Sequence, residues 1–169
     1  MLVMNTKVPL FRLGVLLPFL VFYALGQSGD LPSELGTMKL TKTLQGKEAR
    51  AFINRLHEKD VTPKNSVMGE YGGGKEQATL YVSIYDLRAN AAEAAKRMTR
   101  LISKGNRVFG QYKEIKHSRL LIGRCEGLGQ IHYFFLDRDR VFWLAVDSSV
   151  AGATLESLVR SVTGKAAGP

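Results

Sequence analysis

The pair of residues in this sequence that most resembles a nucleophile and its base is Cys125 and His132. If residues 126–129 form a turn between two strands, Cys125 lies opposite Gln130, and His132 is displaced diagonally on the same face by roughly 7–8 Å. A thiol-dependent enzyme that uses Cys125 and His132 is therefore one hypothesis. The alternative is a buried, inert thiol, the usual state of a lone cysteine in a strand. We favour the buried thiol and predict no catalytic residues.

Three other groupings could carry chemistry, but each is incomplete. Residues 72–75 (Gly-Gly-Gly-Lys) suggest a phosphate-binding loop, yet Glu76 stands where a P-loop has Ser or Thr, and a predicted strand follows. Asp137 and Asp139 alternate with arginines in a predicted turn, which favours a solvated turn. The three histidines have no metal-ligand spacing, and a zinc site needs three or four convergent donors. We therefore predict no metal and no cofactor.

Positive charge is concentrated between residues 88 and 119. The chain has 24 Lys and Arg against 15 Asp and Glu, and this segment holds nine of the cations with only Glu93 and Glu114 to oppose them. Such a run is usually a solvated face. The alternative is a docking surface for anionic lipid headgroups, envelope polymers or an acidic partner. No nucleic-acid-binding motif accompanies the charge, so we expect no nucleic acid partner. The candidate anion-binding residues are Lys96, Arg97, Arg100, Lys104, Arg107, Lys113 and Lys116.

Aromatic residues gather in the predicted strands after residue 80. Their simplest role is core packing. If helices cover only one face of the sheet, however, the other face exposes aromatic side chains and forms a partner or ligand site. An alternative function is therefore a structural or assembly subunit that pairs through this face. The candidate residues of this face are Tyr81, Tyr85, Tyr133 and Trp143.

Residues 1–26 have the pattern of a secretory signal peptide. Lys7 and Arg12 precede an apolar run at 13–25, which small and polar residues follow. Spanning a bilayer takes roughly 20 apolar residues, so this shorter run, with Pro18 inside it, favours a cleaved signal over an uncleaved anchor. The sequence predicts an exported protein, periplasmic or otherwise extracytoplasmic, that contacts the membrane through this segment before or without cleavage. Its single cysteine excludes an intrachain disulfide.

The remaining sequence divides into a linker at 27–37, a single domain at 38–164 and a flexible tail at 165–169. Apolar spacing of three and four predicts helices at 47–59, 90–105 and 155–164. Alternation and β-branched or aromatic content predict strands at 66–71, 78–87, 108–115, 119–125, 130–136 and 141–146. Short loops imply antiparallel neighbours. We expect an α+β fold, with an antiparallel sheet of about five to six strands and about three helices packed mainly on one face. A doubly wound parallel sheet is the alternative.

Four stretches resemble exported bacterial domains of unknown function. They are the strand 80–85, the Glu93-Ala94 step, the glycines at 123, 127 and 129, and the segment 132–135. The resemblance covers residues 67–162 and implies the fold and export. These families have no defined activity, so the resemblance assigns no catalytic residue. The sequence therefore predicts an exported, non-catalytic binding domain that docks to an anionic envelope component or partner protein, with its oligomeric state open.

Overall fold

The computed structural model describes residues 31–57, 63 and 65–164. The predicted signal peptide at 1–26 and tail at 165–169 lie outside these residues. Eleven elements follow one another along the chain: β1 (Glu34–Leu35), β2 (Met38–Gln45), α1 (Gly46–His57), β3 (Asn65–Gly73), β4 (Glu76–Ile84), α2 (Arg88–Ser103), β5 (Phe109–His117), β6 (Leu120–Gly127), β7 (Gln130–Asp137), β8 (Arg140–Val146) and α3 (Ala151–Gly164).

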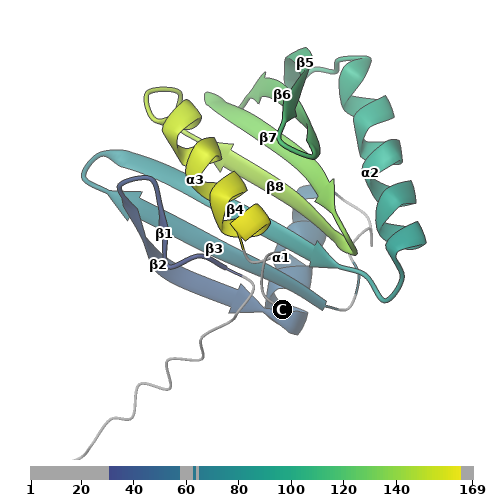
Figure 1. The fold of residues 1–169 in the computed structure, drawn as a ribbon, viewed down its shortest axis with the longest axis horizontal. Helices are drawn as coiled ribbons and strands as arrows, with labels where there is room; N and C mark the ends of the chain where they lie inside the picture. Colours follow the sequence, from purple (N-terminus) through teal and green to yellow (C-terminus); the bar gives the residue numbers. More distant parts are fainter. Residues whose placement is uncertain (1–30, 58–62, 64, 165–169) are drawn as a thin grey trace, which may run out of the picture.

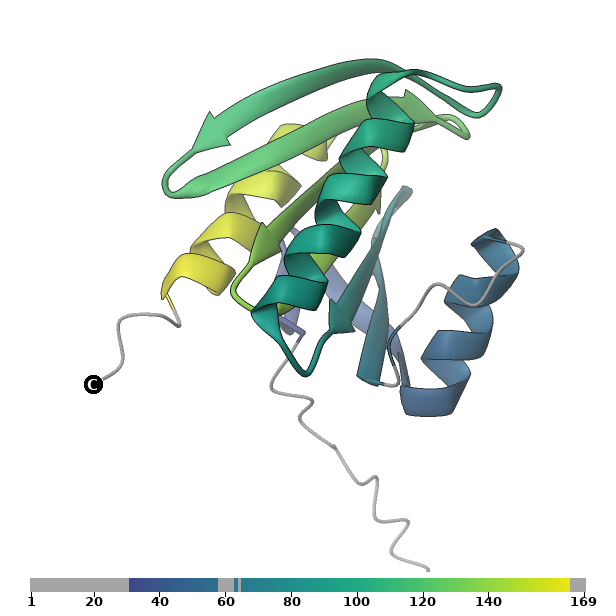
Figure 2. The same cartoon turned by 90° about the vertical axis from the view of Figure 1, so that its right-hand side faces the viewer.

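The strands form one antiparallel sheet of eight strands, in the order β1-β2-β3-β4-β8-β7-β6-β5. The sheet curves into a half-barrel (Figures 1 and 2). Its β5–β6 end curls over α3, so that His117 Nε2 at the end of β5 lies 2.7 Å from Glu156 Oε1 on α3. The predicted α+β class and antiparallel pairing are confirmed, and the parallel alternative is wrong.

The predicted number of strands is too low, because β1 and β2 were not expected. Strand β2 does not alternate between buried and exposed residues: Met38 is buried, and every position after it is exposed or half-buried. Strand β1 has only two residues and lies within the segment predicted as a linker. Leu31 and Leu35 from that segment are buried in the core. Glycine, proline and serine around these two leucines concealed their contribution to the fold.

The larger core lies between the sheet and α3. Leu80 of β4, Leu144 of β8 and Leu158 of α3 are all fully buried there. The inward residues of β6 and β7, including Ile122 and Phe135, extend the same cluster. Figure 1 shows α3 in front of the sheet, across β4 and β8. This face therefore holds most of the buried apolar surface, which is the main source of folding stability.

The opposite face of the sheet is covered by α1 and α2. Helix α2 packs on β5, β7 and β8, and α1 packs on β2 and β3. The ring of Phe52 on α1 stacks on Tyr81 of β4, with centroids 6.4 Å apart. The prediction that the helices lie mainly on one face holds for α1 and α2, whereas α3 covers the other face. The strands carry large apolar residues on both sides, as Leu144 and Trp143 illustrate, so both faces need cover.

Candidate functional site

Helix α2 and its C-cap residue, Lys104, carry a row of cations on the side that points away from the sheet. With 3.6 residues per turn, Lys96, Arg97, Arg100 and Lys104 fall within about a third of the helix circumference. This arc is opposite the side that buries Ala91 and Ile102 against the sheet. All four side chains are exposed. We call these four residues the cationic stripe; the exposed carboxylate of Glu93 is the one acidic side chain on α2.

The cationic stripe has no ion-pair partner among the described residues. The ion pairs of the described chain involve cations elsewhere: Lys42, His117, Arg119, Arg124 and Arg140. Arg97 lies close enough to Tyr85 to affect its hydroxyl: burial raises the pKa of Tyr85, and the charge of Arg97 opposes that shift. The positive field of the stripe is therefore open to solvent and to an anionic partner.

The other three candidate anion-binding residues do not all join the stripe. Arg107 is exposed in the connection that follows α2. On β5, Lys116 pairs with Leu121, and Lys113 pairs with Arg124. Residues paired across an antiparallel ladder share a face, and faces alternate along a strand. Lys116 therefore lies on the α2 side of the sheet, whereas Lys113 lies on the α3 side.

An aromatic layer beneath α2 fixes the position of the stripe. Phe134 stacks on Trp143 with centroids 5.3 Å apart and planes 9° apart. Phe109 meets Trp143 edge-on at 5.5 Å. Met98 and Ile102 of α2 pack on this layer. The layer gives α2 a rigid apolar support, so its charged side must face outward.

The predicted aromatic face divides between the two sides of the sheet. Tyr81 pairs directly with Trp143, and both lie on the α1 and α2 side. Tyr133 pairs with Leu144 and is buried in the α3 core, so grouping it with them is wrong. Tyr85 follows β4, where its N–H donates to the carbonyl of Asp139. Tyr81 and Trp143 are both half-buried rather than exposed. Core packing therefore accounts for most of this aromatic surface.

His132 is held as a neutral imidazole by two hydrogen bonds. The indole N–H of Trp143 donates to Nδ1 at 3.1 Å, and an indole nitrogen can only donate. The proton of His132 must therefore be on Nε2, which donates to the carbonyl of Gly127 at 2.9 Å. Burial lowers the pKa of His132, against a smaller opposing effect of the bond to Gly127. Sequence analysis missed this network, since nothing local links Trp143 to His132.

Cys125 lies directly opposite His132 in the ladder, not opposite Gln130 as the sequence suggested. The turn between β6 and β7 has two residues rather than four, which shifts the register. Burial raises the pKa of the Cys125 thiol to about 11, against a smaller opposing effect of Arg124. Both imidazole nitrogens of His132 are occupied, so no lone pair is available to accept the thiol proton. The geometry favours the buried, inert thiol.

The glycine run and the paired carboxylates occupy hairpins. Gly69 and Gly74 have the glycine spacing of a P-loop, but the segment forms the β3–β4 hairpin and no helix follows it. Asp137 accepts from Arg119 at 2.9 Å, and Asp139 lies 4.0 Å from Arg140. Asp139 lies in the turn, as the sequence favoured, but the prediction of a solvated turn is wrong for Asp137, which ends β7 with a side chain only 12% exposed.

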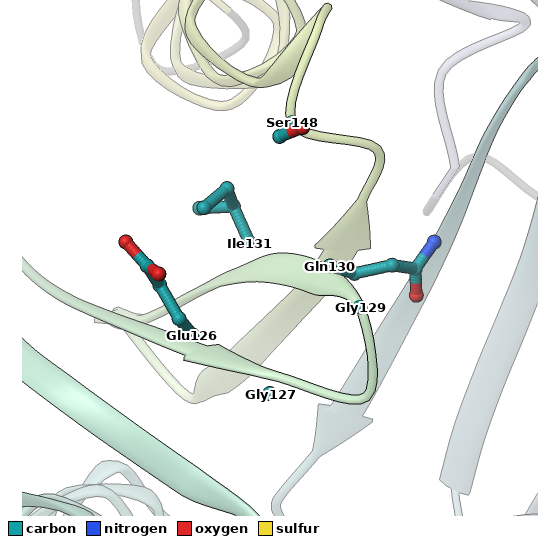
Figure 3. Close-up of a pocket in the computed structure, with 6 residues that line it drawn as sticks. All are labelled: Glu126, Gly127, Gly129, Gln130, Ile131 and Ser148. Carbon is teal, nitrogen blue, oxygen red and sulfur yellow. The ribbon is translucent and has the colours of Figure 1, made fainter.

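A shallow pocket of about 410 Å³ lies between the β6–β7 hairpin and the start of α3 (Figure 3). Glu126, Ile131 and Ser148 line it, while Gln130 points away and donates to Asp147 at 3.1 Å. The carboxylate of Glu126 is already paired with Arg124 at 2.8 Å. The lining thus offers one engaged carboxylate and no second charge for chemistry.

Within the described ranges, no group of three or more His, Cys, Asp or Glu is arranged to hold a metal ion. In the same part of the chain, no helix is both long and apolar enough to cross a membrane. Comparison with known proteins found no matching family model, no matching curated protein and no matching solved structure. The cationic stripe and its aromatic support are therefore the candidate functional site on their geometry alone.

Proposed function

We propose that this chain is an exported, non-catalytic binding domain that docks to an anionic component of the cell envelope through the cationic stripe. The observation that carries the proposal is the unpaired state of Lys96, Arg97, Arg100 and Lys104 on the outer side of a rigidly supported helix. Each cation close to an anionic surface contributes about 1 kcal/mol to binding. Four such residues in one arc are therefore sufficient to bind an anionic surface by electrostatic attraction.

Binding of the full chain to soluble polyphosphate tests this electrostatic site. We expect the double variant Arg97→Glu/Arg100→Glu to lose at least about tenfold in affinity, because two attractive contacts become repulsive. The matched control is Lys39→Glu/Lys47→Glu, which makes the same change in net charge at two exposed positions on β2 and α1. Equal losses in the two double variants would mean that only net charge matters, and the proposal would fail.

Export is tested separately in cells that express the full chain. Fractionation should recover the protein outside the cytoplasm, with a mass that lacks residues 1–26 if the signal is cleaved. Recovery of the full-length chain from the soluble cytoplasm would reject the envelope as its place of action.

A further inference from the structure

Two exposed apolar residues lie in neighbouring segments of the chain, beyond the C-terminal end of α2. Val108, in the α2–β5 connection, is 47% exposed, and Leu128, in the β6–β7 turn, is 75% exposed. The two segments touch: a Cβ added to Gly127 would lie 2.6 Å from the carbonyl oxygen of Val108. Figure 2 shows this connection and this turn together at the upper right. We call Val108 and Leu128 the apolar tip.

The base of the apolar tip is rigid. Asn106 Oδ1 accepts hydrogen bonds from the N–H groups of Val108 and Phe109, both at 2.8 Å. The N–H of Asn106 donates to the carbonyl of Phe109 at 2.9 Å. The ring of Phe109 packs at 5.0 Å on His132, within the aromatic layer. These bonds fix the backbone at Val108, so this segment needs no backbone ordering on binding.

Leu128 is an unexpected residue for its turn. Its φ is 52°, and Gly129 follows with φ 78°, a pair of positive values for which Asn-Gly is the usual sequence. The other two-residue hairpins of the same sheet have Gly36, Gly74, Ser118 and Arg138 at the positive-φ position. A leucine at this position neither stabilises the turn nor buries its own side chain. It is the most exposed large apolar residue of the described chain, and together with Val108 it makes this end of the molecule the candidate for an apolar contact.

Cations lie on the Val108 side of the apolar tip. Lys104 and Arg107 are exposed on the connection that carries Val108, and Arg100 lies one turn back on α2. Leu101, also on that last turn, adds a third exposed apolar side chain, at 60%. The nearby carboxylate of Glu126 is neutralised by Arg124. Apolar side chains next to exposed Lys and Arg are the pattern of a surface that enters the interface of an anionic bilayer.

We propose that the apolar tip inserts into the interface of an anionic phospholipid bilayer, with Lys104 and Arg107 over the headgroups. This inference rests on the proposed function and names the bilayer as its anionic component. A bilayer suits the tip better than a protein, because a fluid interface accepts protruding side chains without a shaped complement. A stable protein interface buries about 800 Å² per partner, which a few protruding side chains do not supply.

Tryptophan quenching by brominated lipids tests the insertion directly in the full chain. We expect Leu128→Trp to be quenched in vesicles of brominated phosphatidylglycerol at least twofold more than wild type, whose single tryptophan, Trp143, is half-buried beneath α2. The matched control is Leu87→Trp. Leu87 is 62% exposed and lies beside Asp86, at the other end of α2, a 16-residue helix about 24 Å long. It should show no added quenching.

The outcomes separate the two proposals. Lys104→Glu/Arg107→Glu in the Leu128→Trp chain should abolish the added quenching, and brominated phosphatidylcholine should give none. Equal quenching of the two tryptophan variants, or none at Leu128→Trp, would overturn insertion. If Arg97→Glu/Arg100→Glu still weakens polyphosphate binding in that case, the docking function stands without the bilayer. If Leu128→Trp fails to fold, Leu128→Asn replaces it, because asparagine suits positive φ. Leu128→Asn should lower co-sedimentation of the protein with phosphatidylglycerol vesicles several-fold. Unchanged co-sedimentation would equally overturn insertion.

Discussion

Helices α3 and α2 pack on opposite faces of the same sheet but use their residues differently. Helix α3 buries five side chains, Ala151, Thr154, Leu155, Leu158 and Val159, and all but Thr154 belong to the main core. Helix α2 is two residues longer and buries only Ala91 and Ile102. Most of its remaining surface is exposed or half-buried and carries cations. The contrast indicates that α3 serves mainly the stability of the fold, while α2 presents a charged surface on a small aromatic support.

The largest expected effect comes from truncating a core residue of α3. Leu158→Ala removes a fully buried side chain and should lower the free energy of unfolding by about 2–5 kcal/mol. Met98→Ala on α2 removes a half-buried side chain, so it should cost clearly less. Guanidinium unfolding followed by circular dichroism measures both. If Met98→Ala destabilises as much as Leu158→Ala, the division of roles between the helices is wrong.

A second prediction concerns a glycine under the aromatic layer. Gly123→Ala would place a Cβ 2.4 Å from Cζ of Phe134, so the ring must shift, and we expect a loss of about 1–3 kcal/mol in unfolding free energy. Gly152→Ala on α3 is the control, since nothing lies within 4 Å of its added Cβ. It should be neutral or stabilise by up to about 1 kcal/mol. Thermal unfolding compares the two, and a tolerated Gly123→Ala would show that the aromatic layer is loosely packed.

A third prediction is an acid sensitivity of the α2 side. The pKa of His132 is lowered in the folded protein by burial, so the unfolded chain binds a proton that the folded chain excludes. The contribution of His132 to the free energy of unfolding is fully present above the pKa of about 6.5 that histidine has in the unfolded chain. It is lost as pH falls below that value, by at most about 1.4 kcal/mol per pH unit. Unfolding at pH 7.5 and 5.5 measures the loss, which His132→Gln should reduce. His117→Gln, on the α3 side, is the control; a pH dependence that follows His117 instead would contradict the assignment.

The smallest expected effect is at Cys125. With the pKa of its thiol raised to about 11, about one thiol in a thousand is ionised at pH 8, and the side chain is also buried. Iodoacetamide should modify the native protein far more slowly than the urea-unfolded chain. Cys125→Ser should leave polyphosphate binding unchanged. Rapid labelling of the native protein, or loss of function in Cys125→Ser, would instead support the thiol-enzyme hypothesis.

Local patterns predicted the helices and six of the strands, because amphipathic spacing and alternation depend on neighbouring residues alone. The stripe on α2 was predictable for the same reason, since Lys96 and Arg100 are one turn apart. The pairing of strands and the face that each residue occupies were not predictable in this way. The two-residue turn at Leu128 placed Cys125 opposite His132, and strand alternation sent Lys113 to the other face. The number of helix-covered faces depends on the whole sheet, which no single segment reveals.

The hydrogen bond between Trp143 and His132 gives the protein an intrinsic optical sensor. The chain has one tryptophan, and its indole N–H donates to the imidazole nitrogen that a proton would occupy. Adding that proton must break the bond and place a positive charge beside the fluorophore. The emission spectrum of the unlabelled protein therefore reports the protonation state of the aromatic layer, so its integrity under α2 can be followed by fluorescence in every variant that keeps this pair and adds no second tryptophan.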